Sequence, residues 1–152
     1  MQLFIVAVGK ARGSAEHRLA EEWLRRLPEG GSIREVESKI RVGAKRKDDE
    51  GRRLLKAMPD GAAIAILDPR GKDHSSEDLA ALIGAWRDSG YGSAAFAIGG
   101  ADGHATHVRQ KAFCTISFGR ATWPHMLCRA MLAEQLYRAS MILAGHPYHR
   151  SN

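Results

Sequence analysis

The segment Ile116–Ser140, ISFGRATWPHMLCRAMLAEQLYRAS, passes from a short apolar stretch through a polar loop into a long apolar helix. Upstream, Phe96–Gly103, FAIGGADG, has the pattern of a second strand that ends in glycines. Strands followed by loops of this kind place ligand sites at the carboxyl edge of a parallel sheet. The sequence therefore predicts a binding site at that edge. The basic aromatic tail His146–Arg150, HPYHR, suggests that a negatively charged partner reaches it.

Apolar stretches and helical patterns alternate along the whole chain. We expect strands at 3–8, 33–37, 62–67, 94–98 and 114–118 and helices at 14–27, 48–58, 75–90 and 122–143. This alternation predicts one α/β domain, residues 1–152, with a mostly parallel sheet and helices on both faces. Ser75 and Asp78 have capping-box spacing, and Thr122 is the expected N-cap of the last helix, with Pro124 in its first turn. Asp68–Gly71 is expected to be a loop.

Composition and charge narrow the class of protein. The chain has 152 residues, 44% hydrophobic and 26% charged, which is ordinary for one globular domain. No apolar run approaches the roughly 18–20 residues of a membrane span, and the apolar start lacks the basic region of a secretory signal. Cys114 and Cys128 are expected to be buried free thiols. We therefore expect a cytoplasmic protein that meets no membrane. The net charge of +6 favours nucleic acid as the partner.

The last predicted helix is apolar on two sides. One stripe comprises Met126, Ala130, Ala133, Tyr137 and Met141, and the other comprises Leu132, Leu136, Ala139 and Leu143. A helix that is apolar on two sides is buried on two sides. In so small a domain one side can face the sheet and the other a second protomer, so we expect a homodimer. In the first helix, the predicted buried face is Leu19, Trp23 and Leu27.

Three further patterns each have two interpretations. Gly99–Gly103 is either a tight turn or a turn that lets a ligand approach the backbone, and its spacing is not the dinucleotide fingerprint. Lys39–Arg53 is either a solvated face or an RNA-contacting surface. Arg70 and Lys72 either lie in a solvated loop or meet phosphate. No metal site is predicted, because the nearest His and Cys set, His104, His107 and Cys114, lacks a fourth ligand.

Taken together, several motifs resemble one family. They are Ile98–Gly100 with Gly103, Ser117–Phe118, Thr122–His125, Arg129, Glu134–Ala139 and His146–Arg150, and both Leu3–Gly9 and Leu67–Lys72 fit the same pattern. This combination is similar to the bacterial large-subunit rRNA pseudouridine-N3 methyltransferases of the SPOUT class. The resemblance implies a carboxyl-terminal trefoil knot, a rare feature in proteins. It also implies an obligate homodimer, S-adenosylmethionine as methyl donor, and a pseudouridine of 23S rRNA (position 1915 in the family) as target on the assembled ribosome.

The resemblance also implies site residues. By position, the cofactor site comprises Leu67, Gly99, Phe118, Gly119, Arg120, Ala121, Thr122 and Trp123. Methylation of N3 requires positioning, removal of a proton and stabilisation of the resulting negative charge. We expect the target base to be surrounded by His125, Arg138, Tyr148, His149 and Arg150, some of them contributed across the dimer. His125 and His149 are both candidate bases.

Three alternatives remain open at this point. The chain could be an RNA-binding module without catalysis, in which the glycine loops are only turns. A nicotinamide-dependent oxidoreductase is a second alternative, although the misplaced glycines count against it. A SPOUT methyltransferase that acts on another RNA, such as tRNA, is the third.

Overall fold

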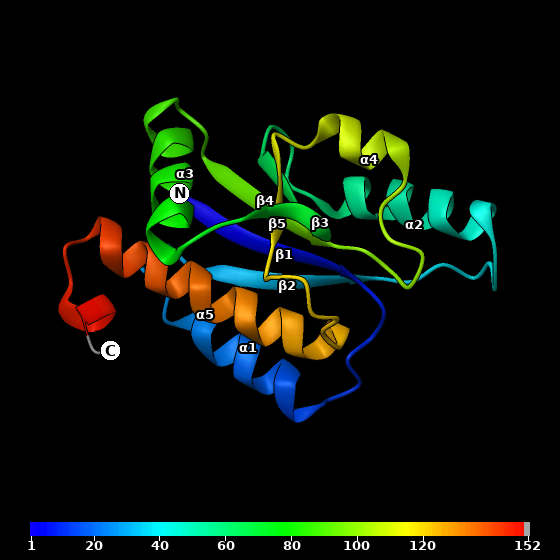
Figure 1. The fold of residues 1–152 in the computed structure, drawn as a ribbon, viewed down its shortest axis with the longest axis horizontal. Helices are drawn as coiled ribbons and strands as arrows, with labels where there is room; N and C mark the ends of the chain where they lie inside the picture. Colours follow the sequence, from blue (N-terminus) through cyan, green and yellow to red (C-terminus); the bar gives the residue numbers. More distant parts are fainter. Residues whose placement is uncertain (151–152) are drawn as a thin grey trace.

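A five-stranded parallel sheet forms the centre of the fold (Figure 1). The computed structural model describes the backbone of residues 1–150 and the side chains of residues 1–148. Within them the strand order is β2-β1-β4-β3-β5. The strands are β1 (Gln2–Val8), β2 (Gly31–Val36), β3 (Ala63–Asp73), β4 (Ser93–Ile98) and β5 (Cys114–Ser117). The helices are α1 (Ala15–Arg25), α2 (Ala44–Ala57), α3 (Ser76–Asp88), α4 (Thr106–Lys111) and α5 (His125–Leu143), followed by the 3-10 helix η1 (Pro147–Arg150).

Helices cover both faces of the sheet, as predicted. On one face α1, α3 and α5 pack against strand residues such as Ile5 and Phe96. On the other face α2 and α4 pack against Val6, Ile66 and their neighbours. Consecutive strand residues therefore face opposite helix layers, and both are buried. Each such Ile, Val or Phe side chain stabilises the fold by about 1.5–3 kcal/mol relative to an exposed position.

The structure corrects two predicted helix starts. α2 begins at Ala44, four residues before the predicted start at 48, directly after Gly43 with φ +86°. Its acidic residues lie one turn further in, where Asp48 pairs with Arg52 across one helical turn. The predicted Thr122 cap is wrong, because Pro124 is the N-cap of α5 and no side chain caps that helix. The predicted capping box of α3 is confirmed by reciprocal bonds of 3.0 Å at Ser75 and Asp78.

The structure differs from the sequence-based expectations in four further places. The segment expected as a loop at 68–71 continues β3, because Lys72 and Asp73 pair again with β5. α4 was missed, since six residues are too short to show helical periodicity. Of the residues predicted to be buried in the first helix, Leu27 is buried just beyond the end of α1 and Trp23 packs partly against the core. Leu19, however, is 47% exposed, and Ala20 and Leu24 are the buried positions within α1. The free cysteines are half-buried rather than buried, and desolvation raises the pKa of both thiols.

One residue of β5 has two strand partners. Ile116 pairs with Leu67 and also with Lys72, both in parallel register. The register shifts between these two pairings, so residues 68–71 bulge out of the ladder between β3 and β5. Gly71 permits the contact with β5, since a Cβ there would lie 2.7 Å from the carbonyl oxygen of Thr115. The carboxyl-terminal trefoil knot implied by the resemblance stays a prediction.

α5 lies between α1 and α3 (Figure 1), but its exposed apolar side is neither predicted stripe. Members of both stripes, among them Leu132, Ala133 and Leu136, are fully buried within the protomer. Leu127, 40% exposed, and Met131 instead face an open groove. The groove is also lined by Leu19, Trp23 and Phe118. This groove, rather than a predicted stripe, is the apolar surface that α5 presents.

Candidate functional site

A cavity of about 240 Å³ lies at the ends of β4 and β5, beside Leu67, Asp68 and Pro69 in the middle of β3. Seven of the eight predicted cofactor residues line it, namely Leu67, Gly99, Phe118, Gly119, Ala121, Thr122 and Trp123. The eighth, Arg120, is exposed and does not line the cavity. His125 lines it as well, at the start of α5. Three segments far apart in the sequence therefore meet at the carboxyl edge of the sheet, where parallel sheets bind ligands.

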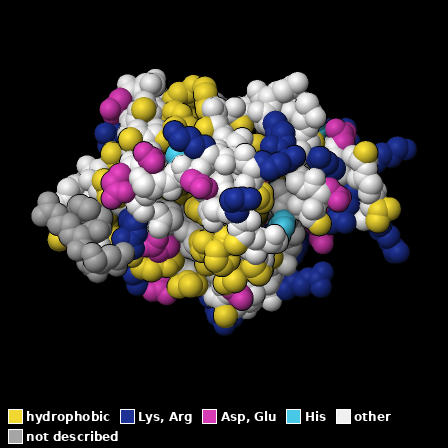
Figure 2. Space-filling view, viewed as in Figure 1, with side chains coloured by type: hydrophobic (Ala, Val, Ile, Leu, Met, Phe, Trp, Pro, Cys, Tyr) yellow, Lys and Arg dark blue, Asp and Glu magenta, His cyan; other side chains and the backbone are white. Residues whose placement is uncertain are grey.

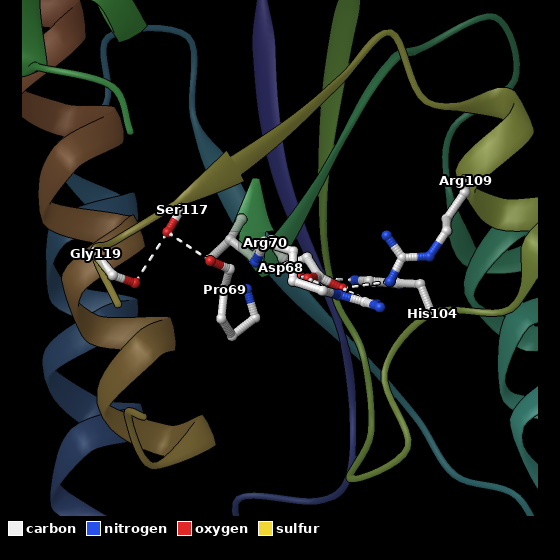
Figure 3. Close-up of polar contacts among 8 residues, drawn as sticks. Asp68, Pro69, Arg70, His104, Arg109, Ser117 and Gly119 are labelled. Carbon is white, nitrogen blue, oxygen red and sulfur yellow. Dashed lines mark hydrogen bonds and ion pairs between the residues drawn. The ribbon is translucent and has the colours of Figure 1, made fainter. Parts of the chain in front are cut away.

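The loop between β5 and α5 is held in shape by its own polar groups. The Ser117 hydroxyl donates to the carbonyl of Gly119 at 3.0 Å and reaches the Pro69 carbonyl at 3.4 Å (Figure 3). The Trp123 indole N–H donates to the carbonyl of Phe118 at 3.1 Å. Gly119 has φ +88°, a conformation that strongly favours glycine. The loop therefore presents a defined wall to the cavity before any ligand arrives.

The glycine turn after β4 forms the opposite wall. Gly103 N–H donates to the Gly100 carbonyl at 3.0 Å, which closes the turn. A Cβ on Gly99 would lie 3.1 Å from the backbone of Gly103, and one on Gly100 would lie 2.6 Å from a carboxylate oxygen of Glu50. A side chain at either position would therefore crowd the turn, Gly103 has φ +75°, which favours glycine, and the same turn also faces the cavity.

Two of the predicted catalytic residues form a separate cluster. Arg138 donates to Glu134 Oε1 from Nε at 3.0 Å and from Nη2 at 2.7 Å, and the Tyr148 hydroxyl donates to the same oxygen at 3.0 Å. The Arg138 guanidinium also lies 4.9 Å from the centre of the Tyr148 ring. At 1.5 Å per residue, Arg138 is about 20 Å along α5 from His125. The side chains of His149 and Arg150 lie outside the described residues.

Comparison with known proteins identifies the family. A family profile described as "Predicted SPOUT methyltransferase" matches residues 1–149. The chain belongs to the SPOUT methyltransferase family. It is 50% identical over 151 residues to the ribosomal RNA large subunit methyltransferase H of Paramagnetospirillum magneticum, covering 99% of each chain. The protein of the same name from Rhodospirillum centenum is 49% identical over 152 residues, covering 99% of this chain and all of the relative.

Membership in the SPOUT methyltransferase family argues against the oxidoreductase alternative. Among the residues that the structure describes, no helix is long and apolar enough to cross a membrane. The same residues contain no group of three or more His, Cys, Asp or Glu side chains placed to hold a metal ion.

An ion-pair cluster borders the cavity of this SPOUT methyltransferase, and the sequence did not indicate it. Asp68 is 6% exposed and accepts hydrogen bonds from Arg70 Nε at 3.0 Å and from Arg109 Nη2 (Figure 3). The Arg70 guanidinium, together with Arg109, holds the pKa of the Asp68 carboxyl well below its usual range despite burial. Arg70 is therefore committed to Asp68, although most of its side chain is exposed. Neither predicted interpretation describes Arg70 fully, because its guanidinium is neither simply solvated nor free to bind phosphate but is paired with Asp68.

A buried histidine supports β3 where it borders the cavity, at Leu67. His104 is 2% exposed, and its Nε2–H donates to the Leu67 carbonyl at 3.0 Å. Burial lowers the pKa of His104 to about 4, so its imidazole is neutral near pH 7. Since Nε2 carries the proton for Leu67, Nδ1 is an acceptor, and it has no partner. The spacing of His104 in the sequence suggests at most a metal ligand, whereas its partner is a backbone carbonyl 37 residues away.

The buried His104 should make the fold sensitive to mild acid. A folded-state pKa near 4, below the unfolded value near 6.5, means that the unfolded chain binds the proton first as the pH falls. The free energy of unfolding should therefore drop by about 2 kcal/mol between pH 7.5 and pH 5. Urea unfolding at the two pH values measures this drop. His104→Gln should remove most of it, and the exposed His125→Gln should not; equal drops in all three proteins would contradict the assignment.

Proposed function

We propose that this chain is an S-adenosylmethionine-dependent methyltransferase that modifies N3 of a pseudouridine in large-subunit rRNA, on assembled ribosomes in the cytoplasm. The observation that carries the proposal is the meeting of three separate segments, Leu67, Gly99 and 118–123, around one cavity. The name shared by the close relatives supports rRNA as the substrate class. The basic charge of the chain supports a nucleic-acid substrate independently.

The cavity residues fit S-adenosylmethionine. Leu67, Ile98 and Ile116 supply apolar walls for a flat ring, while the turns around Gly99 and Gly119 place backbone rather than side chains at the surface. The neutral His104 adds no positive charge that would repel a sulfonium cation. When bound, this cofactor supplies an electrophilic methyl group. Leu67, Gly99 and the loop 118–123 would hold it and fix the direction of that group.

We further propose that the working enzyme is a homodimer with composite sites. Within one protomer His125 lies at the cavity, whereas Arg138 and Tyr148 lie about 20 Å along α5. A two-fold axis across α5 runs two copies of the helix antiparallel and brings the Arg138 end of one copy to the His125 end of the other. The groove lined by Leu19, Trp23, Leu127 and Met131 is the apolar surface that such a dimer would bury.

Each predicted residue then has a role in the chemistry. His125 lines the cavity and is exposed, so it can take the N3 proton of a base placed there. Arg138, charged at all relevant pH values, would stabilise the negative charge that this leaves on the base. Glu134 orients Arg138 and Tyr148 through a shared oxygen. His149 and Arg150 remain candidates for the base and for a phosphate contact.

Methylation of ribosomes tests the proposal directly. Ribosomes that lack the modification, incubated with the protein and radiolabelled S-adenosylmethionine, should gain about one methyl group per large subunit, a stoichiometry expected of a single positioned base. Nuclease digestion and mass spectrometry should place the methyl group on N3 of a pseudouridine. Ribosomes with uridine in place of that pseudouridine are the control. Methylation of tRNA instead would favour another RNA target, and a folded protein that binds no S-adenosylmethionine would favour the non-catalytic alternative.

A further inference from the structure

The loops at the carboxyl edge carry many exposed basic side chains. They are Lys10 and Arg12 after β1, Lys39 and Arg41 between β2 and α2, Lys45 in the first turn of α2, Lys72 at the end of β3, and Arg120 after β5. Exposed acidic residues on these same loops are fewer, namely Glu37, Asp73 and Asp102. Figure 2 shows Lys and Arg side chains protruding at the end of the molecule where β2 leads into α2. The cavity opens at this same edge.

The basic residues between β2 and α2 differ from those further along the helix. Arg46, Arg52 and Arg53 each pair with a carboxylate four residues away, so their charges support α2. In the described part of the chain, Lys39, Arg41 and Lys45 have no carboxylate within ion-pair distance. We call these three residues the β2–α2 surface. Their charges are available to a partner.

Helix stability does not account for the β2–α2 surface. The first turn of α2 has no acidic residue and no side-chain cap, and it carries Lys45, Arg46 and Lys47. Positive charge at a helix N-terminus is disfavoured by the helix dipole. Two apolar side chains alternate in sequence with the cations of the β2–α2 surface and are also exposed, Ile40 at 38% and Val42 at 79%. Exposed cations interleaved with apolar groups fit the phosphates and ribose faces of a nucleic acid.

The loop that carries the surface is ordered by internal hydrogen bonds. Ser38 Oγ donates to Asp49 at 2.6 Å and accepts from the Ile40 N–H at 3.1 Å. Arg46 Nη1 donates to the Arg41 carbonyl at 3.0 Å. The loop is therefore tied to α2 at two points. A surface held in this way loses less conformational entropy on binding than a flexible tail.

We propose that the β2–α2 surface binds the phosphate backbone of rRNA next to the target nucleotide and so orients the ribosome over the cavity. This inference rests on the proposed function. RNA is favoured over an acidic protein because the surface lies at the same edge of the sheet as the cavity, and other loops at that edge are also basic. Phosphate contacts fix register and orientation without reading sequence. The surface therefore sets affinity for the substrate, while the cavity carries the chemistry.

The test is a triple variant with a matched control. Lys39→Gln, Arg41→Gln and Lys45→Gln together remove three charges from the surface. The control, Arg25→Gln, Arg87→Gln and Lys111→Gln, removes three exposed charges from the last turns of α1, α3 and α4, at the opposite edge of the sheet. Both proteins should bind S-adenosylmethionine like the parent. Binding to large ribosomal subunits is measured by sedimentation at several salt concentrations, and KM and kcat by methylation.

The surface variant should bind large subunits at least about tenfold more weakly at 0.1 M salt, and its salt dependence should flatten by roughly one power of salt concentration per lost contact. Its KM should rise with kcat unchanged, and the control should match the parent. If both variants bound large subunits with the affinity and salt dependence of the parent, the proposal that this surface binds rRNA would be overturned. If only the surface variant lost salt-dependent binding, but none of the three proteins transferred a methyl group, the RNA-binding surface would be supported and the proposed function contradicted. Equal loss in both variants would indicate general charge attraction and would also overturn the proposal that this surface binds rRNA.

Discussion

Replacing Arg129 with leucine should lower the free energy of unfolding by about 3–5 kcal/mol, the range typical of breaking a buried charge network. Arg129 is a fully buried side chain in the second turn of α5, with none of its surface exposed. Its Nη2 donates to the carbonyls of Val8 at 3.0 Å and Gly9 at 2.7 Å, and its Nη1 donates to Glu35 at 2.5 Å. One side chain therefore joins α5 to the ends of β1 and β2.

The expected loss comes from the groups that Arg129 leaves behind. Two backbone carbonyls would lose their guanidinium donor, at about 1–3 kcal/mol for each group that stays buried and unsatisfied. Glu35 would lose a charged partner as well. Burial raises the pKa of Glu35, but the Ala11 N–H and Arg129 lower it by more, so it is ionised near neutral pH. Because the Glu35 side chain is 22% exposed, water can replace part of what it loses.

Thermal and urea unfolding measure the Arg129 effect. A loss of this size in a chain of this length should lower Tm by roughly 10 °C. Arg26→Leu is the matched control, because its pair with Glu22 is exposed and such pairs contribute little. Arg129→Lys should lie between the two, since one ammonium cannot reach three oxygens in the geometry of a guanidinium. An Arg129→Leu variant no less stable than Arg26→Leu would show that these bonds do not hold α5.

The position of the site could be predicted from the sequence because strand ends are local features. Apolar runs that stop at Leu67, Ile98 and Ser117 indicate three parallel strands, and the carboxyl ends of such strands share one edge. The resemblance then named the residues in the loops that follow, and seven of eight line one cavity. Arg120 is the exception: its side chain points to solvent, although its backbone belongs to the same loop.

The partners of the buried polar residues could not be predicted in the same way. Arg129 and Glu35 are 94 residues apart, Asp68 and Arg109 are 41 apart, and His104 and Leu67 are 37 apart. No periodicity links positions so distant, and each pairing depends on how the helices pack. The prediction of which apolar side of α5 is exposed was wrong for a related reason. Periodicity found apolar sides on the helix, but α1 and α3 decide which of them stay exposed.

A mixture of two inactive variants should regain activity if the active site is composite. Gly99→Val places side-chain atoms against the Gly103 backbone, where even a Cβ would lie at 3.1 Å, and should abolish cofactor binding. Arg138→Ala removes the proposed anion-stabilising cation and should lower kcat by about 10²–10³ while leaving cofactor binding intact. Each homodimer alone is then inactive, for a different reason. The single variants are measured first, by calorimetry with S-adenosylmethionine and by methylation of ribosomes.

Mixed dimers distinguish the two arrangements of the site. If the cavity of one protomer works with Arg138 of its partner, a mixed dimer has one site with both lesions and one with neither. Random re-pairing makes half of the dimers mixed, so activity should return to about a quarter of the parent level. If each protomer used its own Arg138, every site in the mixture would carry one lesion and activity would stay at the background. Co-expression with two affinity tags isolates the mixed dimer, which should reach about half of the parent activity because one of its two symmetric sites is intact. If the groove lined by Leu127 is the dimer interface, replacing Leu127 with glutamate should abolish both the dimer and the recovery.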